Sequence, residues 1–393
     1  MKANSDGDKI MKVNTSWPKN LLFSCIALVL FASVLEAGAS VLWMIRRPLY
    51  GSDTLMHDPI LHHKWVPNAF WMDHNPKIPF AMYTNAQSWP QKGDIAFAKP
   101  AGVFRIFFLG DSNVQGVVRS EERMVSLVQE KLKAKKSILQ YQVVNTGTCS
   151  YSILPYYMLI KHKIAPYFSP DLVVICVDMT DVPNDYEYRN SVAEFDAEGF
   201  PVRFKDSPEG RKVVLTPFSS RLQTFPEALL DFAKSSSKFV FFMDYYMKYW
   251  RNKASVSLGP STFHDYVKGP ANWMALQYTP EIESNIAYSM RVLGKAIDIL
   301  HEHKVKVLVI GVPHYPQFTG EWSAKPHKIL ETTARLHGAD FFNLYEALKP
   351  EVLGASRADA YYWAIDPSHF NQKGQALWAK YLLAYFDTHN ILP

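Results

Sequence analysis

The chain has 393 residues, a net charge of +5 and a hydrophobic content of 48%. These values exclude a largely disordered protein and provide enough apolar side chains for one large core with appended segments. The lysines and arginines are scattered and no nucleic-acid-binding motif is present, so we expect no nucleic-acid partner. The three cysteines stand apart without CxxC or Cys/His spacing, which argues against disulfides and against a metal site.

An apolar stretch near the N-terminus predicts a membrane helix. Residues Leu21–Ile45 contain a single charge, Glu36, and a helix of this length is roughly 37 Å long, enough to cross a bilayer with some tilt. The alternative is a cleaved signal peptide, because residues 37–39 (AGA) match a small-residue cleavage site. Apolar residues continue to Ile45, which favours an uncleaved signal anchor.

The charges that flank this stretch favour one orientation modestly. Four lysines precede it and two arginines follow it: Lys2, Lys9, Lys12 and Lys19, then Arg46 and Arg47. Because positive residues gather on the cytoplasmic side, we expect residues 1–20 to form a cytoplasmic tail and the rest to face the periplasm or the exterior. Residues 46–100 are rich in Pro, Trp, His and Asn without a sustained period, which indicates an extended segment that wraps the following domain.

From residue 101 to residue 393, short apolar runs alternate with helical stretches. The expected strands are Phe104–Leu109, Tyr141–Asn145, Leu172–Val177, Val305–Gly311 and Asp340–Leu344. The expected helices are Glu121–Lys136, Pro155–Ala165, Glu281–His303, Lys325–His337 and Gln372–Thr388. This alternation predicts an α/β fold with a flavodoxin-like, doubly wound, five-stranded parallel sheet, whose sites form at the carboxyl ends of the strands.

Residues 186–280 interrupt this alternation and are longer than a usual connection, so we interpret them as an insertion. Within the insertion, Phe239–Trp250 is apolar nearly all round. This pattern predicts a buried packing helix; the alternative is a substrate lid or an element that rests on the membrane.

Two motifs at the two ends of this domain carry nucleophile chemistry. The first expected strand runs into Gly110-Asp111-Ser112, which places Ser112 at a strand-to-helix turn, where an ordinary helix N-cap is the alternative. Just before the last helix, Asp366 and His369 stand three residues apart, close enough for the carboxylate to orient the imidazole. There the alternative is a helix start with Asp366 or Ser368 as the cap.

The GDS motif and the C-terminal DxxH motif together resemble the SGNH/GDSL hydrolase superfamily, over about residues 100–185 and 281–393. The resemblance implies that Ser112 is the nucleophile, His369 the base and Asp366 its orienting partner in a serine esterase or acyltransferase. This mechanism needs no metal and no diffusible cofactor. It further implies that Gly147, after the second strand, joins the Ser112 backbone amide in the oxyanion hole.

The third sequence block departs from the family pattern. Members usually end the third strand with G-x-N-D, whereas this chain has Asp178-Met179-Thr180-Asp181. Thr180 therefore replaces the asparagine that acts as third oxyanion donor, and a missing donor can cost about 10²- to 10³-fold in rate. Three options stay open: Thr180 as the donor, Asn184 reaching in from four residues on, or no side-chain donor.

The remaining histidines differ in position. His314 follows the fourth expected strand at the sheet edge, so we expect it to contact substrate, whereas His62, His63 and His74 fall in the irregular segment and are expected at the surface.

The front of the chain is similar to the membrane-anchored bacterial branch of the same superfamily. The matching features are Glu36 in the apolar helix, then Asp58-Pro59-Ile60-Leu61, Pro67-Asn68 and Thr84-Asn85. This resemblance implies a single-pass protein of the bacterial inner membrane that acts on acyl esters, expected to be acetyl esters, of a cell-surface glycan, with polysaccharide-assembly proteins as candidate partners. The altered third block leaves a rival: a non-catalytic, membrane-anchored binding or assembly protein for polysaccharide export.

Overall fold

The computed structural model describes residues 17–45, 48–49, 54–72, 81–135, 137–206, 237, 239–240, 243, 247, 269–355, 357–364 and 366–393. The chain divides into two compact units, one of Met1–Arg47 with Ser220–Lys248 and the other of Pro48–Ser219 with Tyr249–Pro393. The second unit holds the sheet and every residue discussed as part of a site. His74 and most of Phe239–Trp250 lie outside the described residues.

The first unit contains helix α1 (Trp17–Ile45). Its stretch Leu21–Val41 has a mean hydropathy of 2.2 and is long and apolar enough to cross a membrane, a test that a signal sequence also passes. The Glu36 carboxylate of α1 accepts hydrogen bonds from Ser237 Oγ at 2.6 Å and from the Phe239 backbone N–H at 3.0 Å. Glu36, the single charge of the stretch Leu21–Val41, is therefore hydrogen-bonded within its own unit.

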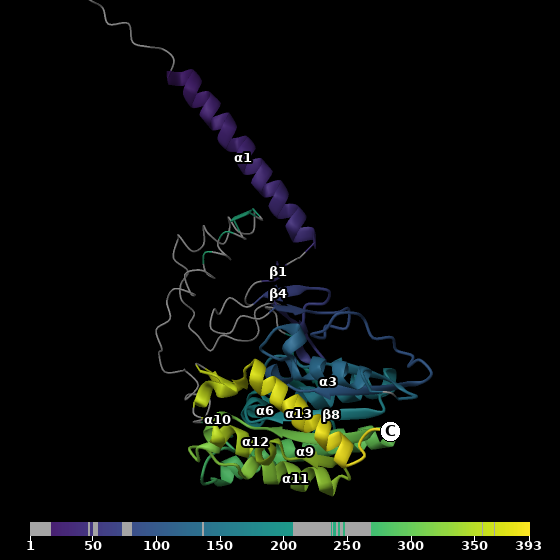
Figure 1. Cartoon of the computed structure of the whole chain (residues 1–393). Helices are drawn as coiled ribbons and strands as arrows, with labels where there is room; N and C mark the ends of the chain where they lie inside the picture. The colour runs from purple at the N-terminus through teal and green to yellow at the C-terminus, as the bar shows by residue number, and fades with distance from the viewer. Residues whose placement is uncertain are drawn as a thin grey trace, which may run out of the picture. The chain divides into compact units, whose positions relative to one another are not determined.

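A five-stranded parallel sheet forms the centre of the second unit (Figure 1). Its strands are β6 (Val103–Leu109), β7 (Gln140–Asn145), β8 (Leu172–Asp178), β11 (Lys306–Val312) and β12 (Asp340–Phe342). They lie in the order β12-β11-β8-β6-β7, and every neighbouring pair is parallel. Numbered along the chain, this is the order 2-1-3-4-5 of a flavodoxin-like sheet, so the predicted fold class is confirmed.

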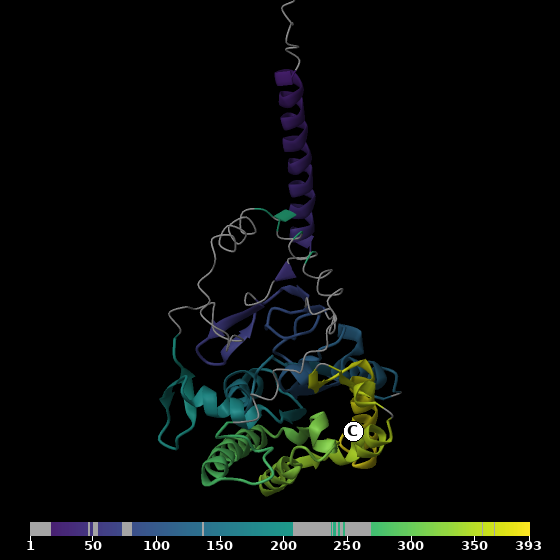
Figure 2. The ribbon, with the colours of Figure 1, turned by 90° about the vertical axis from the view of Figure 1, so that its left-hand side faces the viewer.

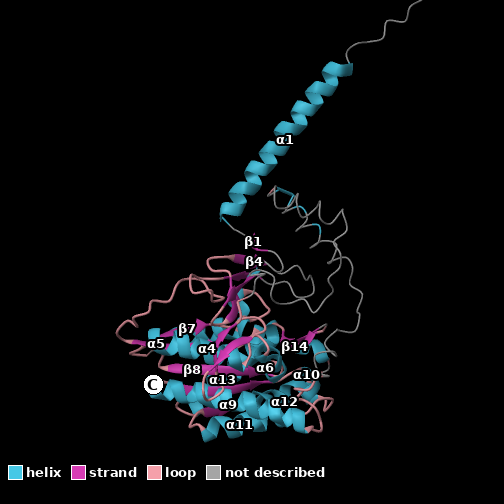
Figure 3. Cartoon of the chain, turned by 180° about the vertical axis from the view of Figure 1, so that it is seen from behind, coloured by secondary structure: helices cyan, strands magenta, loops and turns pink. Residues whose placement is uncertain are grey.

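Helices cover both faces of the sheet, as Figure 3 shows with helices in cyan and strands in magenta. Helices α3 (Met124–Lys133), α12 (Leu344–Gly354) and α13 (Gln372–Thr388) pack on the face that receives Ile106 and Phe108 of β6. Helices α4 (Ile153–Leu159), α9 (Pro280–Glu302) and α11 (Lys325–Leu336) pack on the face that receives Phe107 and Leu109. Alternate residues of each strand thus enter two separate cores. Figure 2 gives the ribbon turned by 90°, with α9 in green and α13 in yellow.

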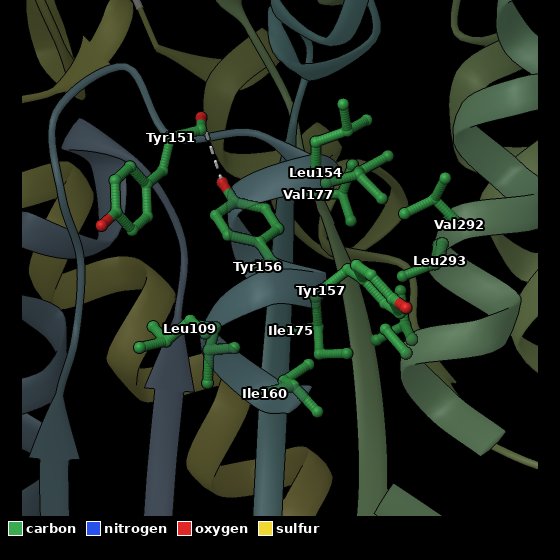
Figure 4. Close-up of a cluster of buried hydrophobic side chains, with 14 of the residues drawn as sticks. Leu109, Tyr151, Leu154, Tyr156, Tyr157, Ile160, Ile175, Val177, Val292 and Leu293 are labelled. Carbon is green, nitrogen blue, oxygen red and sulfur yellow. Dashed lines mark hydrogen bonds between the residues drawn. The ribbon is translucent and has the colours of Figure 1, made fainter. Parts of the chain in front are cut away.

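The larger core gathers side chains from β6, β8, α4 and α9 (Figure 4). Val177 and Ile175 of β8 lie against Leu154 and Ile160, and Val292 and Leu293 of α9 close the cluster from the other side (Figure 4). Burial of these apolar side chains holds the ends of β6 and β8 beside one another, which fixes the loops that follow both strands.

The described residues before the sheet form short strands. Its elements are β1 (Pro48–Leu49), β2 (Leu55–Asp58), β3 (His62–Trp65), β4 (Phe70–Met72) and β5 (Ala81–Tyr83). Strands β2 and β3 form an antiparallel hairpin whose turn is held by Asp58 Oδ1, the acceptor of the Ile60 and Leu61 amides. His62 and His63 are buried in this hairpin, so the expected surface position is wrong for both.

The remaining described elements connect these parts. They are α2 (Ser112–Gln115), η2 (Ser120–Glu122), the π-helical turn η3 (Ile160–Ile164), α5 (Ala165–Tyr167), α6 (Asp181–Arg189), β9 (Val192–Phe195), β10 (Pro201–Phe204), α10 (Tyr315–Phe318), η5 (Ala358–Ala360), β13 (Tyr362–Trp363) and β14 (Asp366–Phe370). Within the expected insertion 186–280, β9 and β10 form an antiparallel pair, and Phe239, Val240, Met243 and Met247 are helical.

Replacement of Asn371 by Ala is expected to destabilise the second unit more than an ordinary cap mutation. Asn371 Oδ1 caps α13 by accepting from the Lys373 and Gly374 amides, and its Nδ2 donates to two backbone oxygens, of Asp359 and Tyr362. We expect a loss of about 2–3 kcal/mol in the free energy of unfolding. Urea unfolding of the detergent-solubilised chain, followed by tryptophan fluorescence, measures it.

Asn343→Ala is the matched control, because Asn343 caps α12 through one exposed hydrogen bond to the Glu346 amide. We expect a loss of about 1 kcal/mol or less there. Equal losses at the two positions would show that the additional bonds of Asn371 do not stabilise the fold.

Candidate active site

The turn after β6 presents Ser112 at the carboxyl edge of the sheet. The N-cap of α2 is Asp111, whose Oδ1 accepts the Asn113 backbone amide at 2.8 Å. The capping bond therefore belongs to Asp111, and the Ser112 hydroxyl is left for other partners. Ser112 Oγ lies 3.2 Å from Asp111 Oδ2 and 2.7 Å from His369 Nε2.

Asp366 and His369 lie on strand β14 and not at a helix start. β14 pairs with β13, and the cap of the following helix α13 is Asn371. His369 Nδ1 lies 2.6 Å from Asp366 Oδ2, and the Ser368 hydroxyl donates to the other carboxylate oxygen of Asp366. The structure thus brings Ser112, His369 and Asp366 together in a continuous hydrogen-bonded chain, with the His369 side chain 21% exposed.

The charges around His369 favour its protonated form. Burial lowers the pKa of His369, but the carboxylates of Asp366, Asp111 and Asp178 outweigh this effect and raise the pKa to about 9. Burial alone would raise the pKa of Asp366, yet its contacts with His369 and Ser368 bring that pKa well below its usual range. At neutral pH, an imidazolium at His369 donates to Asp366 and to Ser112 Oγ, whose own proton then points to Asp111.

Gly147 lies directly against the backbone of residues 110–116, the turn that carries the expected nucleophile Ser112 and is called the nucleophile turn below. A Cβ on Gly147 would lie 2.2 Å from the Gln115 nitrogen and 2.7 Å from the Val114 carbonyl carbon, so only glycine fits. Its N–H, however, donates to Asn145 Oδ1 at 2.9 Å. The expected oxyanion donor is close to the site but is already hydrogen-bonded, whereas the Ser112 N–H has no acceptor among the described residues.

Thr180, the first of the expected third oxyanion donors, is also hydrogen-bonded within the protein. The Thr180 hydroxyl donates to Asp178 Oδ1 at 2.7 Å, and the Thr180 amide donates to the same oxygen at 2.9 Å. Asn184 is half-buried in the first turn of α6, where its backbone N–H donates to the Thr180 backbone oxygen. Asn184 is therefore next to Thr180, but no contact joins its side chain to Ser112 in the described part of the chain.

His314 requires a correction. Its side chain is fully buried, and its Nε2 lies 2.9 Å from Asp178 Oδ2. A ring with no exposed surface that is bonded to a buried carboxylate does not fit the expected substrate contact. Strands β8 and β11 are neighbours, and Asp178 at the end of β8 pairs with Val312, two residues before His314. The His314 ring therefore contacts the Asp178 carboxylate.

Residues of the N-terminal hairpin hold the loop that contains Gly147. Trp65 Nε1 donates to Gly147 O at 3.3 Å, and His63 Nε2 lies 2.9 Å from Cys149 O. From α6, the Tyr188 hydroxyl donates to Ser150 O at 2.6 Å. Sequence reasoning missed this role, since a hairpin contact 82 residues away leaves no periodic signal.

Three buried carboxylates are the one group with metal-ligand spacing among the described residues. Oxygens of Asp111, Asp178 and Asp181 lie within 4.8 Å of one another. Burial and the neighbouring Asp178 raise the pKa of Asp111 to about 8, and burial together with Asp111 and Asp178 raises the pKa of Asp181 well above its usual value. These shifts disfavour negative charge on Asp111 and Asp181, whereas at Asp178 the effect of burial is outweighed by His314 and by hydrogen bonds, which lower the pKa.

Comparison by sequence gives no match, either to a protein-family model or to a curated protein. Comparison of the fold gives similar solved structures. They include an acetyl xylan esterase (16% identity, 72% of this chain and 99% of the other, TM-score 0.41), a catalytic variant of an acetylxylan esterase from Geobacillus stearothermophilus (14%, 72% and 93%, 0.40) and a lipase/acylhydrolase from Enterococcus faecalis (15%, 73% and 96%, 0.37).

Replacement of Gly147 by Ala is expected to displace the turn that carries Ser112, because the added methyl group would overlap the Gln115 backbone. We expect the rate at which a fluorophosphonate probe labels Ser112 to fall by at least about 10²-fold, as a displacement of about 1 Å can cause. In-gel fluorescence over a time course measures it.

Gly354→Ala is the control, since nothing lies within 4 Å of a Cβ at this helical position. Its labelling rate should equal that of the unmodified protein. Equal rates for Gly147→Ala would contradict the close packing of Gly147 on the nucleophile turn.

Proposed function

We propose that the protein is a serine-dependent esterase or O-acyltransferase. One observation carries the proposal: Ser112 Oγ lies 2.7 Å from His369 Nε2, while His369 Nδ1 lies 2.6 Å from Asp366 Oδ2. These distances fit a hydroxyl nucleophile, a base that takes its proton and a carboxylate that orients the base.

The reaction begins with the unprotonated form of His369. Its Nε2 takes the Ser112 hydroxyl proton as Oγ attacks the carbonyl carbon of an acyl ester, and the Ser112 N–H faces the oxygen that becomes negative. Collapse of the tetrahedral intermediate expels the alcohol, which receives the proton from His369. Water or a sugar hydroxyl, deprotonated by His369, then attacks the acyl-Ser112 carbonyl and releases the acyl group.

An acetyl ester of a cell-surface glycan is the proposed substrate. Helix α1 supports a location at a membrane, because its apolar stretch is long enough to cross one. The resemblance of the front of the chain to membrane-anchored bacterial relatives supports the glycan and an inner-membrane location with the second unit on the periplasmic or outer side. Polysaccharide-assembly proteins are proposed partners.

A non-catalytic binding or assembly role is the second candidate. The observation that favours it is the engagement of two expected oxyanion donors, since the Gly147 N–H and the Thr180 hydroxyl both donate to side chains of the protein. A fluorophosphonate probe separates the two candidates. Covalent labelling of Ser112 in the folded, detergent-solubilised chain supports the enzyme, and absence of labelling supports the binding protein.

Substitution of the three site residues tests the enzyme directly. We expect Ser112→Ala and His369→Ala to lower hydrolysis of a chromogenic acetyl ester by at least about 10⁴-fold. Asp366→Asn should be about 10-fold less severe, because the nucleophile and the base are both retained and only the orienting carboxylate is lost. The same assay, repeated with a panel of oligosaccharides as acetyl acceptors, distinguishes acetyl transfer from hydrolysis.

Ser126→Ala serves as the matched control, because the hydroxyl of Ser126 in α3 donates to the Ser120 backbone oxygen in η2. Full activity is expected there. An active Ser112→Ala protein would exclude the mechanism, and hydrolysis that no acceptor changes would favour the esterase over the transferase.

The pH dependence follows from the raised pKa of His369. Since only unprotonated His369 accepts the Ser112 proton, kcat/KM should rise with pH and reach its midpoint near the pKa of about 9. In Asp366→Asn the midpoint should move down, because the carboxylate that most strongly raises the His369 pKa is lost. A midpoint of the unmodified protein at or below 6.5, the ordinary value for histidine, would contradict the electrostatics described above.

A further inference from the structure

The carboxylate of Asp178 is the most heavily hydrogen-bonded group near the site. It stands at the end of β8, the middle strand of the sheet, and its side chain is 1% exposed. Its oxygens accept from Asn113 Nδ2 at 2.9 Å, His314 Nε2 at 2.9 Å, the Thr180 amide at 2.9 Å and the Thr180 hydroxyl at 2.7 Å. These donors come from the loops after three strands, β6, β8 and β11.

Asn113 connects this carboxylate to both halves of the site. Its Nδ2 donates to Asp178 and also approaches the Ser368 backbone oxygen at 3.3 Å. Asn113 follows the nucleophile Ser112, and Ser368 precedes the base His369. The same residue is held from α13, because Gln375 Nε2 donates to Asn113 O at 3.1 Å. The nucleophile turn and strand β14 are thus joined through a single amide that Asp178 orients.

The negative charge of the acidic cluster lies on Asp178. Burial alone would raise its pKa, but His314 and Thr180 bring the pKa below the usual value. Burial and the neighbouring carboxylates raise the pKa of Asp111 to about 8 and the pKa of Asp181 well above its usual value. Negative charge in the cluster is therefore favoured on Asp178, the group with the most hydrogen-bond donors, as expected when a low-dielectric interior penalises unpaired charges.

We propose that Asp178, paired with the buried His314, is a positioning residue that aligns Ser112 with His369 through Asn113 and whose charge stabilises the imidazolium of His369. This inference rests on the proposed function. The other titratable groups that face His369 are Asp366 and Asp111, and those that face Asp178 are Asp111, Asp181, Tyr156 and Tyr362 besides His314. Both tyrosines have pKa values raised by burial and remain neutral.

Substitutions separate the alignment from the charge. Asp178→Asn removes the charge and one of the acceptors of Asn113, so the labelling rate of Ser112 by a fluorophosphonate should fall by about 10²-fold and the pH midpoint of labelling should move down. Asn113→Ala removes the hydrogen bonds that join Asp178 to Ser368 but keeps the charge of Asp178. The labelling rate of Ser112 should therefore fall while the pH midpoint of labelling stays unchanged. With an acetyl ester, both variants should lower kcat and leave KM nearly unchanged.

Asp181→Asn is the matched control, because it replaces one neutral group of the cluster by another and should leave the pH midpoint in place. Thermal unfolding of each full-length variant in detergent identifies any that do not fold, and Asn113→Ala keeps the proposal testable if Asp178→Asn is among them. An unchanged rate in Asn113→Ala, or an unchanged midpoint in folded Asp178→Asn, would overturn the proposal.

The same assay separates this inference from the proposed function. Failure of the unmodified protein to label at any pH would contradict the proposed function, and the inference with it. Labelling of the unmodified protein together with wild-type behaviour of Asp178→Asn would overturn the role of Asp178 alone.

Discussion

The hydrogen bond between Ser112 Oγ and His369 Nε2 joins two residues that are 257 positions apart in the chain. Neither the strand that ends before Ser112 nor the short strand β14 could make this contact alone. The contact depends on the parallel sheet, because β6 and β8 end at the same edge. Helix α13 packs on the core beside β6, and this packing places β14, which directly precedes α13, at that edge. Asn371 and Gln375 fix the start of α13 against β13 and the nucleophile turn.

The surroundings of this bond explain why the resting site holds a proton. The pKa of Asp366 beside His369 lies well below its usual range and the pKa of Asp178 in the buried cluster is also lowered, so both carboxyl groups favour the ionised form. Both favour an imidazolium, so the resting hydrogen bonds run from His369 to Ser112 and from Ser112 to Asp111. For Gly147 to bind a developing oxyanion, its N–H must leave Asn145 Oδ1. Under the proposed mechanism, His369 must therefore lose a proton before Ser112 can attack, and the Gly147 N–H must be released before it can bind an oxyanion.

The sequence predicted the parts of the structure that have a local pattern. The five strands, the helix Gln372–Thr388 and the flavodoxin-like order follow from buried apolar runs that alternate with amphipathic stretches, and these are confirmed. The predicted Ser112, Asp366 and His369 are close together in the structure. Strand β14 was not expected, because its residues DPSHF have no strand periodicity and are held by β13 and by side-chain bonds of Asp366.

Long-range contacts account for the remaining differences. His314 was expected at the substrate, but the partner that buries it, Asp178, lies 136 positions earlier in the chain. The sequence shows that the third block departs from G-x-N-D. Only the structure shows that the Asp178 carboxylate accepts hydrogen bonds from Asn113 Nδ2 and from the Thr180 hydroxyl. The roles of His63 and Trp65 likewise depend on a loop more than 80 positions away.

The central claim is that Ser112 becomes acylated. Rapid acid quenching of the detergent-solubilised protein during turnover of an activated acetyl ester, followed by peptide mass spectrometry, measures it most directly. We expect an acetyl group on the peptide that contains Ser112, at a level that falls when His369 is replaced by Ala. Turnover with the acetyl group on another residue, or with no acetylated peptide under conditions in which deacylation is rate-limiting, would contradict it.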